Sequence, residues 1–389
     1  MAKPSVYISE DDLFKSESEM QMWLSSELNK KEGLASLVIP FSDEEYSYVD
    51  KKISDSYNYC LKTLSNTKIV CENKDISQFS DEILRPDFLL YSVDYEAWVI
   101  IEIKNIPNPT RQAGTELGAY TNALKTYFPN MSDGDVINVV ISNDWPTLIK
   151  NYIFNEIFWL NRSILCLRPV KHESGIKLEC IRPAILTKAY SDRKLSPKDF
   201  SGYQFCIYGK DIYSGGEVSD IEKNIEQIKS SFQRMVNKAS RLHSHGFAFL
   251  WRDFRKYSLA AYSITIVDIN PFKNNLYSTC NEKGIAAELQ HIIWEYESTG
   301  NTYSLWEIIN DADFYLREIS STWPEAPSNW ITLREFMVED AEIMEFKCWG
   351  RISELYENEL ANEYNKGRFD LKFTDPGFGF YFINNKLFT

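Results

Sequence analysis

The sequence lacks the features that mark secreted, membrane-spanning or disulfide-stabilised proteins. It has seven cysteines, an odd number, and no Cys-x-x-Cys pair, which argues against a disulfide framework or a zinc cage. The first residues, Met1 to Val6, lack the apolar core of a signal peptide. No run approaches the roughly 20 apolar residues that cross a bilayer. We therefore expect a cytoplasmic protein in a reducing compartment, with no membrane partner.

Basic charge is also scarce. The chain has 42 lysines and arginines against 56 aspartates and glutamates, a net charge of −14, which excludes nucleic-acid binding through a broad basic surface. A Gly-x-x-x-x-Gly-Lys phosphate loop is absent, which argues against an ATP-driven motor. Contact with nucleic acid must therefore be local. Basic residues in and around the candidate segment are Arg85, Lys104, Arg111, Lys125, Arg168 and Lys171.

The chain is long enough, and apolar enough, for two large cores. It has 389 residues, of which 44% are hydrophobic and 14% aromatic, and this length favours two domains. The polar stretch from Ser191 to Ser201 contains Pro197 and predicts a boundary. We expect one domain over 1–190 and a second α/β domain over 201–389 that recognises a substrate, a trigger or a partner.

Periodicity in the first half predicts alternating helices and strands. The order is helix, helix, three strands, helix, strand, helix and hairpin, which predicts an α/β domain with a mixed sheet flanked by helices. The expected helices cover 12–29, 44–64, 110–128, with a cap at Thr110, and 146–160. The expected strands cover 67–71, 87–91, 98–104, 136–141, 164–170 and 176–181.

The second half contains further β-like runs and ends in helical patterns. Strands are expected over 203–208, 247–251 and 262–268. Helices are expected over 220–243, 284–298, 304–320 and 333–364. This pattern predicts a second α/β domain with a helical tail.

The expected strand 98–104 carries the strongest functional signal. Alternation places Trp98, Ile100, Glu102 and Lys104 on one face and apolar residues on the other. A strand that is apolar on both faces is buried in its sheet. A buried carboxylate and ammonium are costly unless they meet a counter-charge, a metal or water.

Asp87 opens the preceding strand, directly after Pro86. A hairpin-like return would bring its carboxylate to Glu102, and two converging carboxylates favour Mg²⁺ or Mn²⁺ between them. Glu-x-Lys alone is a weak signal, because it also occurs at 72–74 and 345–347. Only the copy at 102–104 ends a continuous apolar β-run and follows the Pro-Asp pair. The alternative is a salt-bridged strand end without chemistry.

Pro86-Asp87 followed by Glu102-Ile103-Lys104 resembles the PD-(D/E)XK phosphodiesterase superfamily of restriction, repair and defence nucleases. The expected order of elements over about 12–181 is similar to that family's αβββαβ core, the restriction-endonuclease-like fold. The resemblance implies Asp87 and Glu102 as metal ligands, the Ile103 carbonyl as a further ligand, and Lys104 as the catalytic lysine. It also implies a Mg²⁺- or Mn²⁺-dependent endonuclease in restriction or antiviral defence, with DNA favoured over RNA.

Two flanking helices offer further site residues. Glu17 shares a face with apolar residues of the first helix, where this family supplies an acid, and Glu19 is the rival choice. In the helix after the lysine strand, Gln112, Glu116 and Tyr120 share a face. Relatives have Gln-x-x-x-Tyr there, so this chain departs from the pattern. The sequence leaves open whether Gln112 or Glu116 completes the site.

A second interpretation belongs to a different class. The chain could keep a nuclease fold yet serve as a catalytically silent binding or assembly subunit that acts through its aromatic-rich second domain. Its acidic charge favours a protein partner or a homo-oligomer over nucleic acid in that case.

Overall fold

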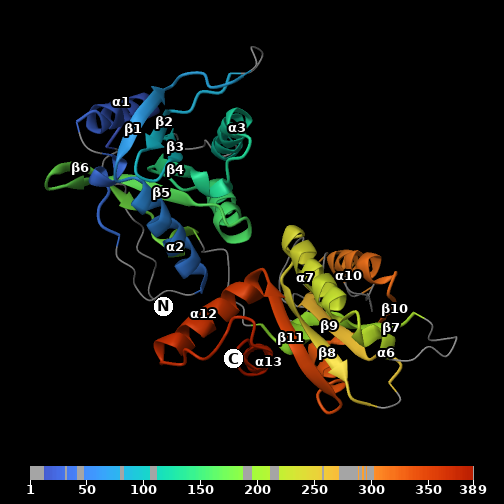
Figure 1. Cartoon of the computed structure of the whole chain (residues 1–389). Helices are drawn as coiled ribbons and strands as arrows, with labels where there is room; N and C mark the ends of the chain where they lie inside the picture. The colour runs from blue at the N-terminus through green and yellow to red at the C-terminus, as the bar shows by residue number, and fades with distance from the viewer. Residues whose placement is uncertain are drawn as a thin grey trace. The chain divides into compact units, whose positions relative to one another are not determined.

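The computed structural model divides the chain into two compact units, 1–192 and 193–389 (Figure 1). It describes residues 13–30, 33–41, 48–78, 83–105, 112–186, 195–210, 219–255, 258–270, 288, 291–292, 295 and 302–388. The division between 192 and 193 falls within the polar stretch 191–201, in which the sequence predicts a boundary. Each unit has its own sheet and core.

The N-terminal unit is built on a mixed sheet of six strands in the order β1-β2-β3-β4-β5-β6. Strands β1, β2 and β3 are antiparallel, β3, β4 and β5 run parallel, and β6 returns antiparallel to β5. The structure confirms the predicted α/β architecture with a mixed sheet. The strands are β1 (Thr67–Glu72), β2 (Phe88–Ser92), β3 (Ala97–Lys104), β4 (Val136–Ser142), β5 (Ile164–His172) and β6 (Gly175–Cys180).

Helices and short turns connect these strands. The α-helices are α1 (Glu17–Leu28), α2 (Tyr48–Thr63), α3 (Gln112–Tyr127), α4 (Thr147–Phe154) and α5 (Pro183–Leu186). Single turns lie at Leu34–Leu37, Asp133–Asp135 and Asn155–Trp159. The expected cap of α3, Thr110, lies outside the described residues.

Helix α1 begins later than the sequence predicts. The Ser16 side chain accepts a hydrogen bond from the Glu19 N–H and caps the helix, so Glu17 is its first residue rather than Asp12. A serine at this position satisfies a backbone donor that the helix itself leaves unpaired. The cap places Glu17 and Glu19 in the first turn.

Strand β3 is covered on both faces, as the alternation predicts. On one face, the Trp98 ring lies 5.5 Å from Phe128, just after α3. On the other face, Ser92 pairs with Ala97 and donates a hydrogen bond to the Thr63 carbonyl at the end of α2. Helices α2 and α3 therefore lie on opposite faces of the strand that carries Glu102 (Figure 1).

The expected helix 146–160 is not uniform. Helix α4 ends at Phe154 and continues as a π-helical turn over Asn155–Trp159. Such turns insert an extra residue into helical winding and are frequent at functional sites. This turn buries Glu156, which is 7% exposed.

The C-terminal unit is an antiparallel sheet in the order β10-β7-β9-β8-β11, with helices on both faces. One core cluster joins the sheet to α7 and α10, and the other joins it to α11, α12 and α13. Its strands are β7 (Phe200–Gly209), β8 (Gly246–Asp253), β9 (Tyr262–Ile269), β10 (Ser320–Asn329) and β11 (Ala341–Trp349). Its helices are a turn at Pro197–Asp199, α6 (Ser219–Glu222), α7 (Ile225–Arg241), α10 (Tyr303–Leu316), α11 (Trp330–Glu335), α12 (Arg351–Asn365) and α13 (Pro376–Asn385).

One prediction for this unit is wrong, and one strand was not predicted. The expected helix 333–364 is interrupted by β11, which pairs with β8 along the sheet edge. The stretch 320–329 forms the opposite edge strand, β10, although it contains Pro324 and Pro327. An edge strand tolerates proline because one of its sides needs no backbone donor. Most of the expected helix 284–298 lies outside the described residues.

No helix in the described part of the chain combines the length and apolar character needed to cross a membrane.

Two glycines of α3 provide a test of its packing. A Cβ at Gly114 would lie 2.8 Å from the Tyr152 ring, whereas a Cβ at Gly118 would meet nothing within 4 Å. We expect Gly114→Ala to lower the free energy of unfolding by about 1 to 3 kcal/mol through overpacking. Gly118→Ala should leave it unchanged or raise it by up to about 1 kcal/mol, because alanine is the better helix former. Urea unfolding of both variants measures this, and equal losses would contradict the packing described.

Candidate acidic site at the end of strand β3

Asp87 and Glu102 lie beside each other where β2 begins and β3 ends. Phe88 pairs with Ile101 across the two antiparallel strands, so the register places Asp87 opposite Glu102. The Ile103 N–H donates a hydrogen bond of 2.7 Å to Asp87 Oδ2. This bond fixes the Asp87 carboxylate against β3, next to Glu102.

Glu102 is nearly inaccessible to solvent, with 4% of its surface exposed. Its Oε1 accepts a hydrogen bond of 2.6 Å from Lys104 Nζ. Its buried Oε2 has no hydrogen-bond partner among the described residues. A buried carboxylate oxygen without a donor is costly, so this atom is suited to receive a cation or water.

Lys104 links β3 to helix α3. Its Nζ lies 2.6 Å from Glu102 Oε1 and 3.0 Å from Glu116 Oε2, and the residue is 7% exposed. Glu116 is thus a residue of α3 that reaches the site. Gln112 is the first residue of α3, but its side chain lies outside the described residues.

Helix α1 contributes Glu17 rather than Glu19. Glu17 Oε1 accepts a hydrogen bond of 3.3 Å from the Asn105 N–H, at the end of β3. Glu19 Oε2 instead accepts one of 2.7 Å from the Lys15 N–H, beside its own helix start. Gln21, one turn after Glu17, donates to the Asp87 carbonyl at 3.4 Å.

Three supporting residues were not assigned this role from the sequence. Asn105 donates through Nδ2 to the Phe14 carbonyl at 2.9 Å and accepts from Asn143 Nδ2 at 2.6 Å. Tyr120 donates to the Arg85 carbonyl at 3.0 Å, so it packs and also holds the strand before Asp87. For Gln21, its spacing of four from Glu17 was the available signal. For Asn105, the signal was a polar amide directly after the lysine strand.

The charges at this site do not balance. The carboxyls of Glu17, Asp87, Glu102 and Glu116 are close enough to influence one another, and the described cation among them is Lys104. Four potential negative charges against one positive charge leave an excess that a divalent cation would offset.

Burial dominates the electrostatics of the two acids. Burial raises the pKa of Glu102 to about 9, and the nearby Asp87 adds to this rise while Lys104 opposes it. Burial raises the pKa of Asp87 to about 6 against the opposing hydrogen bond from Ile103. Burial lowers the pKa of Lys104, but Glu102 and Glu116 more than offset this and hold it above its usual value. The two acids therefore titrate as a pair that retains a proton near neutral pH, while Lys104 stays charged.

The carboxylate oxygens of this site fit a Mg²⁺ or Mn²⁺ ion that takes only some of its ligands from the protein and the rest from water. Among the described residues no group of three or more His, Cys, Asp or Glu side chains is arranged to hold a metal ion. Mg²⁺ does not need such a group, because it is usually held by one or two carboxylates and keeps several waters. The unpartnered Glu102 Oε2 beside Asp87 meets this requirement.

The other two Glu-x-Lys copies differ from the one at 102–104 by burial. Glu345 and Lys347 also lie on a strand, β11, and not on the expected helix. Their side chains are 27% and 20% exposed, against 5% for Glu102. Glu72 ends β1, and Lys74 follows it on the exposed surface. A β-strand context is therefore less distinctive than the sequence suggested, and burial beside a second acid is the discriminating feature.

No protein-family model, curated protein or solved structure matches this chain. Function is therefore inferred from the chemistry of the site itself.

The raised pKa values predict how stability depends on pH when divalent cations are chelated. The folded protein holds protons on Asp87 and Glu102 more tightly than the unfolded chain does, whose values are near 3.8 and 4.5. Their stabilising contribution is complete below those values and is lost as the pH rises through about 6 and then about 9. We expect the free energy of unfolding to fall by about 5 kcal/mol between pH 5 and 8, because each extra proton bound by the folded protein costs about 1.4 kcal/mol per pH unit.

Glu102→Gln removes the group with the larger shift in pKa and should reduce this fall by about three quarters, whereas Glu173→Gln, at an exposed position, should not change it. Chemical denaturation at each pH, in the presence of a chelator, gives the comparison. A wild-type protein that becomes more stable over the same interval would contradict the charge state assigned to the pair.

Proposed function

We propose that this protein hydrolyses phosphodiester bonds with the help of a divalent cation, as an endonuclease similar to the PD-(D/E)XK superfamily. The observation that carries the proposal is the buried Glu102, whose unpartnered oxygen lies beside Asp87 while Lys104 contacts its other oxygen. Two acids and a lysine in this arrangement match the chemistry of metal-dependent phosphodiester cleavage.

The order of elements around the site supports the proposal. Helix α1 precedes strands β1, β2 and β3, and α3 and β4 follow. This succession is similar to the αβββαβ core of the superfamily, with α2 as an additional helix before β1. The acids lie at the start of β2 and near the end of β3, and α1 supplies Glu17.

Each residue has a proposed role. Asp87 and Glu102 would hold the Mg²⁺ or Mn²⁺, with the Ile103 carbonyl as a further ligand. A cation bound there would polarise the phosphate and lower the pKa of a water molecule. Lys104 would stabilise negative charge on the phosphate, and Glu116 would hold its ammonium in place. Glu17, at the edge of this group, would orient water or a second ion.

DNA is the favoured substrate, and restriction or antiviral defence is the proposed setting. The basic residues expected around the site contribute unequally. Arg85 and Lys171 are exposed, whereas Lys125 is paired with Asp133 and Arg168 lies 2.6 Å from Glu179. Arg111 lies outside the described residues. The described members of this set offer few unpaired cations to nucleic acid, so its affinity should fall only modestly with added salt.

Cleavage assays test the activity directly. We expect the purified protein to cut DNA in Mg²⁺ or Mn²⁺, and Asp87→Ala or Lys104→Ala to lower the rate at least about a hundredfold, because electrostatic stabilisation of the phosphate is lost. Glu19→Ala is the matched control, since Glu19 bonds Lys15 instead of the site, and its rate should stay within about threefold. Duplex DNA, single-stranded DNA and RNA are compared in parallel. Cleavage that survives both site variants would refute the assignment.

Measurements of metal binding distinguish the role of Glu102 as a metal ligand from that of Lys104 in cleavage. Calorimetric titration with Mn²⁺ should show binding to wild type and to Lys104→Met, but at least about tenfold weaker binding to Glu102→Gln, which loses a charged ligand. Lys104→Met should nevertheless be inactive in cleavage. Equal Mn²⁺ affinity in wild type and Glu102→Gln would remove the metal from the proposal.

A catalytically silent binding subunit is the second candidate function. It is favoured by a groove of about 540 Å³ in the C-terminal unit and by the exposed Trp306 and Trp323, which are 43% and 65% accessible. Residues lining the groove include Gln204, Asp253, Arg255, Ser258, Phe336 and Met337. A scaffold has no need of a cation at Glu102, so the calorimetric titration distinguishes it from the endonuclease.

A further inference from the structure

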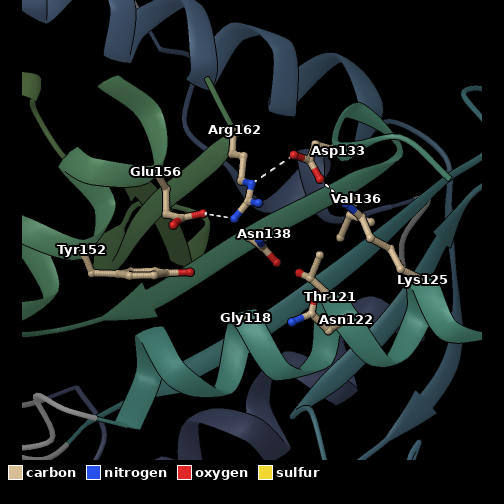
Figure 2. Close-up of a pocket in the computed structure, with 10 residues that line it drawn as sticks. All are labelled: Gly118, Thr121, Asn122, Lys125, Asp133, Val136, Asn138, Tyr152, Glu156 and Arg162. Carbon is tan, nitrogen blue, oxygen red and sulfur yellow. Dashed lines mark hydrogen bonds and ion pairs between the residues drawn. The ribbon is translucent and has the colours of Figure 1, made fainter. Parts of the chain in front are cut away.

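A second polar pocket lies in the N-terminal unit, between α3, β4 and the π-helical turn. It encloses about 120 Å³. Figure 2 shows Tyr152 pointing its hydroxyl toward the middle of the pocket, with Asn138 on the strand beside it and Thr121 on the helix opposite. None of its lining residues belongs to the acidic site at the end of β3.

The pocket and the acidic site share one face of the sheet. Asn138 of β4 pairs in register with Ile100 of β3, two residues before Glu102 on the same face. Helix α3 reaches both places, because Glu116 contacts Lys104 while Gly118 and Thr121 line the pocket.

Two neutral side chains of this pocket have a buried polar atom without a described hydrogen-bond partner. Asn138 is 94% buried, since only 6% of it is exposed, and its buried Oδ1 has no hydrogen-bond partner among the described residues. The buried hydroxyl of Thr121 is likewise without a described partner. Because unpaired polar atoms are costly in a protein interior, these groups are suited to a ligand that supplies their missing hydrogen bonds.

The charged groups of the pocket, by contrast, are paired with one another. Arg162 contacts Asp133 at 3.1 Å and Glu156 at 3.1 Å, and Lys125 also pairs with Asp133. Two cations and two anions cancel, so the lining carries no net charge. A neutral ligand therefore fits better than a phosphate or a metal ion.

Gly118 adds an independent indication of space for a ligand. Glycine is less favourable than alanine inside a helix, and a Cβ at Gly118 would meet nothing within 4 Å. Packing explains Gly114 in the same helix, because Tyr152 lies against it, but it does not explain Gly118. The π-helical turn on the opposite wall, of a type frequent at functional sites, buries Glu156 in this lining.

We propose that this pocket binds a single nucleobase. A base is neutral and flat, and its edge presents adjacent donors and acceptors that match the donor and acceptor of an asparagine amide, as in asparagine pairing with adenine. The volume is below the roughly 300 Å³ at which drug-sized ligands are accommodated, which fits one ring system. The base could belong to a free nucleoside or to an unpaired nucleotide of a nucleic acid.

Titration of the full chain distinguishes these sources. Adenosine, guanosine, cytidine, uridine and thymidine are titrated singly by calorimetry, and a short single-stranded oligonucleotide is titrated in parallel. We expect saturable binding of at least one, with Asn138→Leu or Gly118→Leu weakening it by at least about tenfold through lost hydrogen bonds or lost space. Thr126→Ala, on the exposed side of α3, is the control and should bind within about twofold of wild type.

Binding of a nucleoside identifies the free ligand, and binding of the oligonucleotide alone identifies a base of a nucleic acid. Thr121→Val, nearly isosteric, provides the test if a leucine variant fails to fold. Lys104→Met should bind the nucleosides as wild type does, because they carry no phosphate, so this proposal can fail or succeed separately from the nuclease. Absence of binding by every probe, or equal affinity in wild type and the pocket variants, would show that the pocket holds water only and would overturn the proposal.

Discussion

The N-terminal unit places a cluster of acidic side chains at the end of one central strand, where burial opposes their ionisation. Strand β3 is apolar for most of its length, and burying it carries Glu102 and Lys104 into the interior with it. The neighbouring elements add further carboxylates beside Glu102. Asp87 lies just before β2, α1 contributes Glu17 and α3 contributes Glu116. Apolar groups in these positions would often be equally or more stabilising, so the surplus of acidic groups supports the proposed metal-dependent chemistry.

Helix α3 contributes residues both to the acidic site and to the polar pocket, from two different sets of positions. Glu116 and Tyr120, four residues apart, face the acidic site, whereas Gly118, Thr121 and Lys125 face the second pocket. Both stripes lie against the same sheet face. A ligand in the pocket would therefore contact the same helix that positions Glu116 beside Lys104.

The parts of the fold predicted correctly are those in which the local pattern and the final environment agree. Strands β2, β3 and β4 are mostly apolar, and they are buried on both faces. Strands β10 and β11 were missed because they are half-exposed edge strands whose polar and proline residues resemble a loop or a helix. The pairing with β7 and β8 that stabilises them is not visible in local sequence.

The candidate site could also be predicted only where local sequence pattern determines the position of a side chain. Asp87, Glu102 and Lys104 could be placed together from strand alternation and a hairpin-like return. The choice between Glu17 and Glu19 could not, because both lie in the first turn and only the contact with Asn105 separates them. The role proposed for Asn138 could not be predicted from local sequence. Its unpaired oxygen results from the residues of α3 and of the π-helical turn that face it across the pocket.

Anomalous diffraction from crystals grown with Mn²⁺ tests the central claim most directly. The proposed metal site predicts a manganese peak within about 2.3 Å of one oxygen of Asp87 and one of Glu102, with the Lys104 ammonium directed away from the ion. Crystals saturated with Mn²⁺ that show no peak between these carboxylates, with the Lys104 ammonium still bonded to Glu102, would contradict it.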